Sequence, residues 1–322
     1  MTAASPPRRF PAPTPGAAPA TPDSPPEWQV WAGLWIVYIV WGSTYLAIRI
    51  LVETVPPLLG AGVRFAVAGA AMLAVMALRR GGPSVRIGRP ELLSCLLVGG
   101  LLMGANGVVS VAELEVPSSM AALLIASVPL WVVIYRRGLG ERVAARSVAA
   151  VLIGFAGAAL LLLPGEQTAG ASLAGLLACI GAAAMWAGGS VASPRVPLPR
   201  DPFVSGGWQM LLGGGVCALT GLLTGEAADV EVGAFSTRSL LALAYLIVFG
   251  SWLAFTAYSW LLQNAPLSRV ATYAYVNPIV AIALGVAILD EAVTSLTLAG
   301  AAVIVASVAA VVRTETQRSN SR

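Results

Sequence analysis

The sequence predicts an all-α integral membrane protein whose ten transmembrane helices form two inverted five-helix repeats. Three observations support this fold class. First, 57% of the 322 residues are hydrophobic and 11% are charged, whereas a soluble domain carries about 25% charged residues. Second, apolar stretches of roughly 20 residues recur along the chain, which is the length a helix needs to cross a bilayer. Third, one sequence pattern occurs twice, in residues 117–143 and 266–292.

The duplicated segments read PSSMAALLIASVPLWVVIYRRGLGERV and PLSRVATYAYVNPIVAIALGVAILDEA. The corresponding positions are Pro117 with Pro266, Ser119 with Ser268, Ala122 with Ala271, and Pro129 with Pro278. A chain built from two related halves is typical of transporters in which the halves rock about a shared site. We therefore expect residues 30–164 to form the first repeat and residues 165–313 the second.

The two ends of the chain differ from the repeats in composition. Residues 1–29 are rich in Pro, Ala, Ser and Thr, and they lack the apolar core of a secretory signal. We expect them to form a disordered, Pro-rich cytoplasmic tail. Residues 314–322 are expected to form a second, short cytoplasmic tail.

Each predicted helix is bounded by Pro, Gly or charged residues. In the first repeat the helices are expected at 30–52, 58–78, 91–112, 117–135 and 145–163. Their breaks fall at 56–57, 81–83, 117, 136–141 and 164–165. In the second repeat the helices are expected at 172–193, 203–224, 239–262, 267–289 and 294–312. Their breaks fall at 194–202, 225–231, 266 and 290–291.

The arginines support this helix count independently. With the N-terminus inside, the inside segments contain Arg8, Arg9, Arg79, Arg80, Arg86, Arg89, Arg136, Arg137, Arg142, Arg146, Arg195, Arg200, Arg269, Arg313, Arg318 and Arg322. The outside loops contain only Arg238, as the positive-inside rule expects. Both termini are then cytoplasmic. Because each half has an odd number of helices, the second half runs through the membrane in the opposite sense to the first.

The composition argues against several classes of chemistry. The chain has no His, and all 19 cationic side chains are Arg, which removes imidazole metal sites and Lys Schiff-base catalysis. Its three cysteines lie in apolar runs without metal-site or disulfide spacing. We expect no enzyme activity, no cofactor, no metal site and no nucleic-acid partner.

Arg64 is the most informative single residue, because it sits inside an apolar span. A cation in the hydrocarbon region is costly unless it faces protein, water or a partner. It either attracts an anionic or zwitterionic substrate into a cavity, or it is a structural Arg that bonds helix ends or snorkels outward. Arg49 is followed four residues later by Glu53, so a structural ion pair is expected there.

Two polar residues of the third predicted helix are candidates for the site. Glu113, at the outer end beside Glu115, could carry a coupling proton or attract a cationic substrate, or it could simply be solvated. Asn106 lies deeper, where it could orient a polar ligand or bond a neighbouring helix.

Asn277 and Pro278 interrupt the ninth predicted helix. Pro278 frees a backbone carbonyl and predicts a kink, which is either structural or a gating hinge; Pro129 marks the matching position in the fourth helix. Deep aromatic side chains could line a pocket for an organic solute or could pack in the core. These aromatic candidates are Trp41, Trp186, Tyr258 and Tyr273.

Four stretches together resemble a known family. They are WGSTYLAIR at 41–49, PPLLGAGVRFAVAG at 56–69, NGVVSVAELEVPSSMAALLIASVPL at 106–130 and YAYVNPIVAIALG at 273–285. They are similar to the EamA branch of the drug/metabolite transporter superfamily, and most of all to its YedA-type inner-membrane members. The resemblance covers roughly residues 30–313. It implies ten helices in two inverted repeats around a central cavity, and export of small metabolites, amino acids or drug-like compounds without ATP.

The favoured function is therefore a secondary transporter of a bacterial inner membrane that exports a small organic solute, with proton coupling as one option. A passive facilitator remains an alternative, and a membrane-embedded enzyme is a third reading that the few buried acids disfavour. The expected partners are a small-molecule substrate and the lipid bilayer. The chain is expected to act as a monomer or a homodimer.

Overall fold

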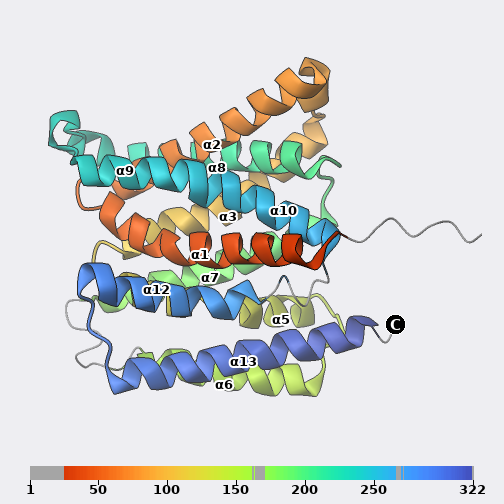
Figure 1. Ribbon diagram of the computed structural model, residues 1–322, viewed down its shortest axis with the longest axis vertical. Coiled ribbons are helices and arrows are strands. Elements are labelled where there is room, and N and C mark those ends of the chain that lie inside the picture. The colour runs from red at the N-terminus through yellow and green to blue at the C-terminus, as the bar shows by residue number, and fades with distance from the viewer. Residues whose placement is uncertain (1–24, 162, 164–170, 266–269, 271, 321–322) are drawn as a thin grey trace, which may run out of the picture.

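A computed structural model describes residues 25–161, 163, 171–265, 270 and 272–320. Every regular element in these residues is helical (Figure 1). Eight helices or joined helices are long and apolar enough to cross a membrane, and two shorter apolar helices accompany them. The eight spans are Glu27–Leu51, Pro57–Arg80, Arg89–Ala112, Ser118–Gly138, Leu173–Arg195, Pro202–Leu223, Thr237–Leu261 and Ser295–Thr314. The two shorter helices are Ala145–Leu161 and Val276–Leu289.

The helices follow the predicted order closely. In the first half they are α1 (Glu27–Leu51), α2 (Pro57–Arg80), α3 (Arg89–Ala112), α4 (Ser118–Ile125), α5 (Val128–Gly138) and α6 (Ala145–Leu161). In the second half they are α7 (Leu173–Ala192), α8 (Pro202–Leu223), α9 (Thr237–Tyr245), α10 (Ala254–Asn264), α12 (Tyr273–Leu289) and α13 (Ser295–Asn320). Four short 3₁₀ segments lie in three of the connections between the described helices: η1 (Gly82–Val85), η3 (Ser193–Arg195), and η4 (Glu226–Asp229) with η5 (Val232–Ala234).

Two expected single helices are interrupted. The helix predicted at 117–135 divides into α4 and α5, because Pro129 stands in the first turn of α5 and cannot donate to the carbonyl one turn back. Ser127 lies in the break, and its hydroxyl donates to the Leu124 carbonyl at 2.6 Å. The helix predicted at 239–262 contains a π-helix, η6 (Leu246–Leu253), between α9 and α10.

The ends of the fold also differ slightly from the prediction. Helix α1 begins at Glu27, directly after Pro26, so the last three residues of the expected tail are helical. An acidic side chain is favourable in the first turn of a helix, where the helix dipole is positive. Helix α13 continues to Asn320, past its predicted end at 312, because no Pro or Gly follows to terminate it. Residues 1–24 lie outside the described part of the chain.

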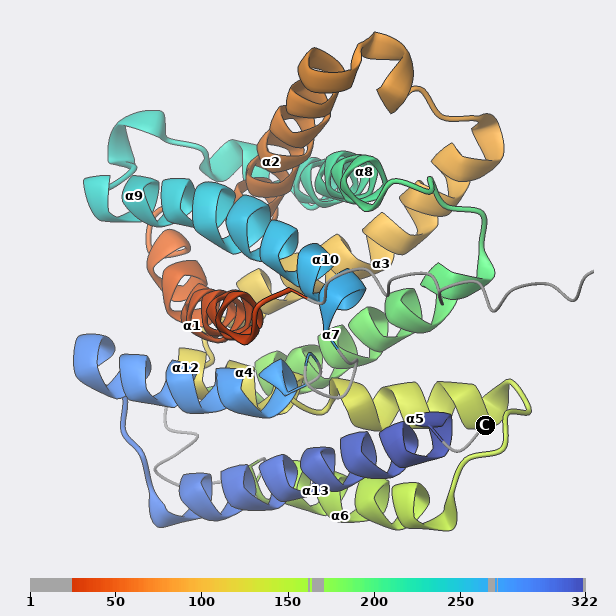
Figure 2. The same cartoon turned by 45° about the vertical axis from the view of Figure 1, so that its right-hand side comes forward.

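The helices form a central group with one peripheral pair. Helix α1 lies between α12 on one side and α9, η6 and α10 on the other, while α2 and α3 both pack along α8 (Figure 2). Helices α6 and α13 pack side by side at one end of the molecule in both views (Figures 1 and 2). The core beneath this pair is formed by fully buried leucine and isoleucine side chains, including Leu130, Leu161 and Ile304.

Glycines allow the backbones of α2, α3 and α8 to come into contact. A Cβ at Gly214 of α8 would lie 2.6 Å from the backbone nitrogen of Ala66 in α2. A Cβ at Gly99 of α3 would overlap the backbone oxygen of Gln209 in α8. The hydrophobic effect does not hold helices together in lipid, so such close packing of small residues is a main source of helix association.

A charged bridge ties α5 to the end of α7. Glu141 accepts a hydrogen bond from Arg136 Nε at 2.7 Å and also pairs with Arg195. The Arg136 guanidinium, followed by that of Arg195, holds the pKa of the Glu141 carboxyl below its ordinary value. Glu141 therefore links two helix ends outside the apolar spans.

Candidate functional site

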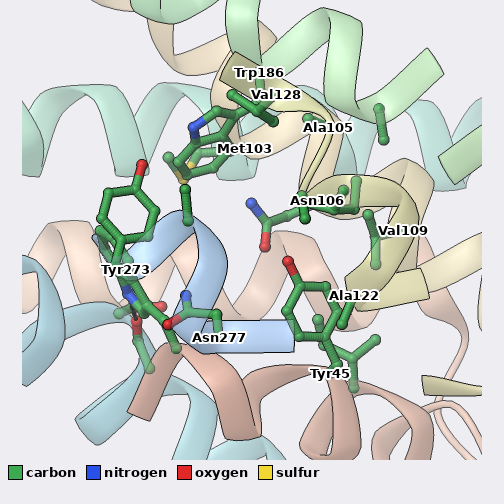
Figure 3. A pocket seen from close by; sticks show the side chains of 18 of the residues that line it. Tyr45, Met103, Ala105, Asn106, Val109, Ala122, Val128, Trp186, Tyr273 and Asn277 are labelled. Carbon is green, nitrogen blue, oxygen red and sulfur yellow. Dashed lines mark hydrogen bonds between the residues drawn. The ribbon is translucent and has the colours of Figure 1, made fainter. Parts of the chain in front are cut away.

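A cavity of about 140 Å³ lies between the helices of the two halves. Its walls come from α1 to α5 of the first half and from α7, α8, η6, α10 and α12 of the second. No described residue of the peripheral pair α6 and α13 lines the cavity. In Figure 3 the side chains of Tyr45, Asn106, Tyr273 and Asn277 surround this space, with Trp186 and Met103 above it.

Arg64 lines the cavity and is 4% exposed, so it does not snorkel to the membrane surface. Its Nε donates a hydrogen bond to Ser251 Oγ at 3.0 Å, and its guanidinium carbon lies 4.4 Å from the centre of the Phe65 ring. No carboxylate of the described residues forms an ion pair with it. The cavity wall therefore contains a buried cation whose hydrogen-bonding partner is a neutral hydroxyl.

The π-helix η6 positions the groups that orient Arg64 and Trp41. Ser251 accepts the Arg64 hydrogen bond, and the neighbouring Gly250 carbonyl accepts one from Trp41 Nε1 at 3.2 Å. A π-turn widens the helix and presents side chains and carbonyls that a regular α-helix would hide, and such turns are frequent at functional sites.

Three aromatic rings meet at one side of the cavity. The centre of the Trp41 ring lies 5.0 Å from that of Tyr258 and 5.2 Å from that of Tyr273, and the two tyrosine ring centres are 5.8 Å apart. Trp41 and Tyr273 line the cavity, whereas Tyr258 does not: it packs behind them and supports their orientation. Trp186 lines a different part of the wall, from α7.

The polar and proline candidates also lie at the cavity. Asn106 donates to the Leu102 carbonyl of its own helix at 3.2 Å, while its side chain borders the space. Asn277 is buried, and its Oδ1 has no hydrogen-bond partner among the described residues. Pro129 and Pro278 both line the wall, but they are not equivalent, because Pro278 lies within the continuous helix α12.

Several lining residues were not singled out from the sequence. Tyr45 lies one helical turn after Trp41, so the same helix face could have indicated it. Phe65, which follows Arg64, and Phe255 are aromatic residues within apolar runs, and nothing in their spacing distinguishes them from core residues. Ser251 reaches Arg64 from the π-helix, and no feature of the sequence predicts that π-helix.

Glu113 does not line the cavity, and it is not solvated. It is 0% exposed at the end of α3, and neither carboxylate oxygen has a hydrogen-bond partner in the described part of the chain. The expected Arg49–Glu53 pair is also wrong. Helix α1 ends at Leu51, so Glu53 falls in the following turn and pairs with Arg238 at 3.5 Å, while Arg49 donates to the backbone carbonyl of Glu113.

Glu291 joins the two halves close to Glu113. Its carboxylate accepts hydrogen bonds at the N-terminus of α4, from Ser118 N at 2.7 Å, Ser118 Oγ at 2.8 Å and Ser119 N at 3.0 Å. A carboxylate satisfies the free N–H groups of a helix start and interacts favourably with the helix dipole. We call this set of contacts, together with Glu113, the carboxylate plug.

The chain is similar in sequence to known transporters. Residues 30–163 and 173–313 each match the model of the EamA-like transporter family. The inner membrane transporter YedA of Escherichia coli (strain K12) is 38% identical over 269 residues, which cover 83% of this chain and 85% of YedA. A Salmonella typhimurium (strain LT2) protein named "Probable amino-acid metabolite efflux pump" is 24% identical over 285 residues, which cover 84% of this chain and 90% of that protein.

A solved crystal structure shares the fold. It superposes with a TM-score of 0.60 at 24% sequence identity, and the match covers 88% of this chain and 96% of that one. At this identity the likeness concerns the arrangement of the helices rather than the site.

Proposed function

The chain belongs to the EamA-like transporter family, and we propose that it is a secondary exporter of small organic metabolites that works by alternating access. One observation carries this proposal: a cavity containing a buried cation and several aromatic rings lies between the two related halves. A site at the interface of repeats can be exposed to either side when one half moves against the other.

We include in the proposal a ten-helix topology in the inner membrane with both termini in the cytoplasm. The two shorter apolar helices, Ala145–Leu161 and Val276–Leu289, stand where the fifth and ninth crossings are required. The helix contacts come in pairs related by exchanging the halves: α2 packs on α8, α6 on α13, and α4 on α12. This pairing supports a two-fold relation, and an odd number of helices per half makes that relation an inversion.

The substrate class follows from the wall of the cavity. Arg64 offers guanidinium donors in a space shielded from bulk water, where a charge-assisted hydrogen bond to a carboxylate is strong. Trp41 and Tyr273 offer flat apolar faces beside it. A small carboxylate that carries an apolar or aromatic group fits both features. Amino acids and related compounds belong to this class, which agrees with the name of the Salmonella relative.

A ligand screen tests the proposal. The purified protein would be heated in the presence of small carboxylates, zwitterions, amines and neutral metabolites, and the compounds that raise its Tm would then be followed as fluxes in proteoliposomes. We expect stabilisation and flux with carboxylates or zwitterions. A Tm that only organic cations raise would contradict the assignment of the substrate class. Flux that runs only down its own gradient would instead favour a facilitator.

A further inference from the structure

The carboxylate plug contains an acidic side chain that the proposed substrate site does not use. Glu113 is fully buried, and both of its carboxylate oxygens are without hydrogen-bond partners among the described residues. An ionised carboxylate buried without donors is far less stable than the neutral acid. The arrangement in the structure therefore favours a Glu113 that holds a proton.

The charged and titratable groups around Glu113 come from several elements. They are Tyr45 and Arg49 on α1, Arg64 on α2, Cys179 on α7, and Glu291 between α12 and α13. The two guanidinium groups attract an ionised Glu113, and the Glu291 carboxylate repels it. Arg49 donates to the backbone carbonyl of Glu113 and Arg64 donates to Ser251, so neither cation neutralises the Glu113 carboxyl directly.

The position of Glu113 links the plug to the cavity. Asn106 and Val109 line the cavity, and Glu113 follows them on the same face of α3, at the spacing of successive helical turns. The plug itself joins the first half to the second, because Glu291 caps α4. A change in the charge of Glu113 therefore alters the electrostatic interactions at the contact between the two halves.

We propose that Glu113 is a proton-binding site that couples the opening of this end of the cavity to proton movement. When the opposite end of the cavity opens, water reaches Glu113 and accepts its proton; the carboxyl O–H bond breaks and leaves a buried carboxylate, which favours separation of the plug. Water then enters, and the carboxylate takes up a proton from the side to which this end opens, so that the plug closes again. For transport the inference rests on the proposed function: each outward step of the solute is exchanged for an inward proton.

Infrared spectroscopy of the wild type and of Glu113→Gln tests the protonation of Glu113 directly. At neutral pH the wild-type protein should show the carbonyl stretch of a protonated carboxylic acid, and this band should be absent from Glu113→Gln. Glu115→Gln is the matched control, because Glu115 is exposed two residues further on, and it should retain the band. A wild-type spectrum without the band, or a band that survives in Glu113→Gln, would overturn the proposal. The measurement needs no transported solute, so its result is independent of the proposed function.

Transport in proteoliposomes tests the coupling. In Glu113→Gln, solute movement driven by an imposed proton gradient should fall at least tenfold, to the background of empty vesicles. Exchange of labelled for unlabelled solute should fall as well, because a neutral side chain at position 113 cannot ionise and the plug stays closed. Glu115→Gln should keep both activities. Gradient-driven transport by Glu113→Gln at the wild-type rate would refute the coupling, whereas a wild type that moves no solute at all would refute the proposed function instead.

Discussion

Arg64 shows that a single charged residue in a membrane protein can mark the position of a cavity. A charge in an apolar span is uncommon enough to stand out in the sequence, and in the structure it borders the cavity that both halves share. Its hydrogen bond to Ser251 fixes the direction of the guanidinium without neutralising it. The cation is therefore oriented before any ligand arrives, which lowers the entropic cost of binding.

Replacing Arg64 tests its role. In Arg64→Ala we expect a substrate to bind about 1.5–3 kcal/mol more weakly, or roughly 10- to 150-fold, because a charge-assisted hydrogen bond is lost. Expression in the membrane should be unchanged. The Kd, measured by calorimetry, checks this, with Arg238→Ala as the control because it removes a cation from an exposed position outside the cavity. Unchanged affinity, or loss of the folded protein, would instead indicate a structural Arg.

At the residue scale, the sequence identified eight of the residues that line the cavity, but it placed Glu113 and the partner of Arg49 wrongly. Trp41, Asn106 and Asn277 are polar or aromatic interruptions of apolar runs, and such interruptions can be recognised without a structure. The burial of Glu113 could not be recognised from the sequence, because it depends on segments distant in sequence that cover the end of α3. The true partner of Arg49 depends on where α1 ends, and terminal residues of helices are the least predictable positions.

At the scale of elements, the glycines of α8 determine how closely the helices approach. A Cβ at Gly214 would meet backbone atoms of α2, which cannot move aside as a flexible side chain can. A Cβ at the next residue, Gly215, would have no atom within 4 Å. The two positions are therefore a matched pair within one helix.

Alanine at these two positions should have opposite effects. Gly214→Ala is expected to cost about 1–3 kcal/mol through overpacking and to lower the Tm by several degrees. Gly215→Ala should leave the Tm unchanged or raise it slightly, because Ala favours the helix by roughly 0.5–1 kcal/mol over Gly. Thermal unfolding in detergent measures both. Equal effects of the two variants would show that the close contact of α2 and α8 does not limit stability.

The two matched prolines act differently on their helices. Pro129 accompanies a complete break between α4 and α5, whereas Pro278 stays inside α12. Both border the cavity, so a bend at either position would change its shape. That either proline acts as a gating hinge remains a prediction. The predicted motion is a bend of the whole helix and not a movement of the proline alone.

Restoring the missing backbone donor in α12 tests the hinge. Pro278→Ala should stabilise α12, because proline inside a helix costs about 3 kcal/mol, and it should change turnover more than the KM. Pro202→Ala is the control, since Pro202 occupies the first turn of α8, where no backbone hydrogen bond is lost. Transport rates at saturating solute compare the two. Wild-type turnover in Pro278→Ala would leave Pro278 with a purely structural role.

At the scale of the whole molecule, the order and approximate bounds of the helices were predictable because Pro, Gly and charged residues separate the apolar runs. The π-helix η6 was not predictable, because its sequence LIVFGSWL contains no residue that demands it. The resemblance to the EamA family extended this reading to function, and the family match over both halves confirms the family. The substrate, the driving ion and the orientation in the membrane stay proposals.

The central claim is that solute crosses through the cavity by alternating access of the two halves. Ser118 is fully buried in the closed plug and contacts Glu291, so a short bifunctional thiol reagent can join cysteines at both positions once opening of the plug exposes them. The native Cys95, Cys179 and Cys217 are buried and should not react.

Flux through the cross-linked Ser118→Cys/Glu291→Cys protein is the most direct measurement, with the same variant before cross-linking as its control. If the plug must open in each cycle, cross-linking should reduce net solute flux at least tenfold, and cleavage of a reducible linker should restore it. Undiminished flux through the cross-linked protein would contradict alternating access at this site.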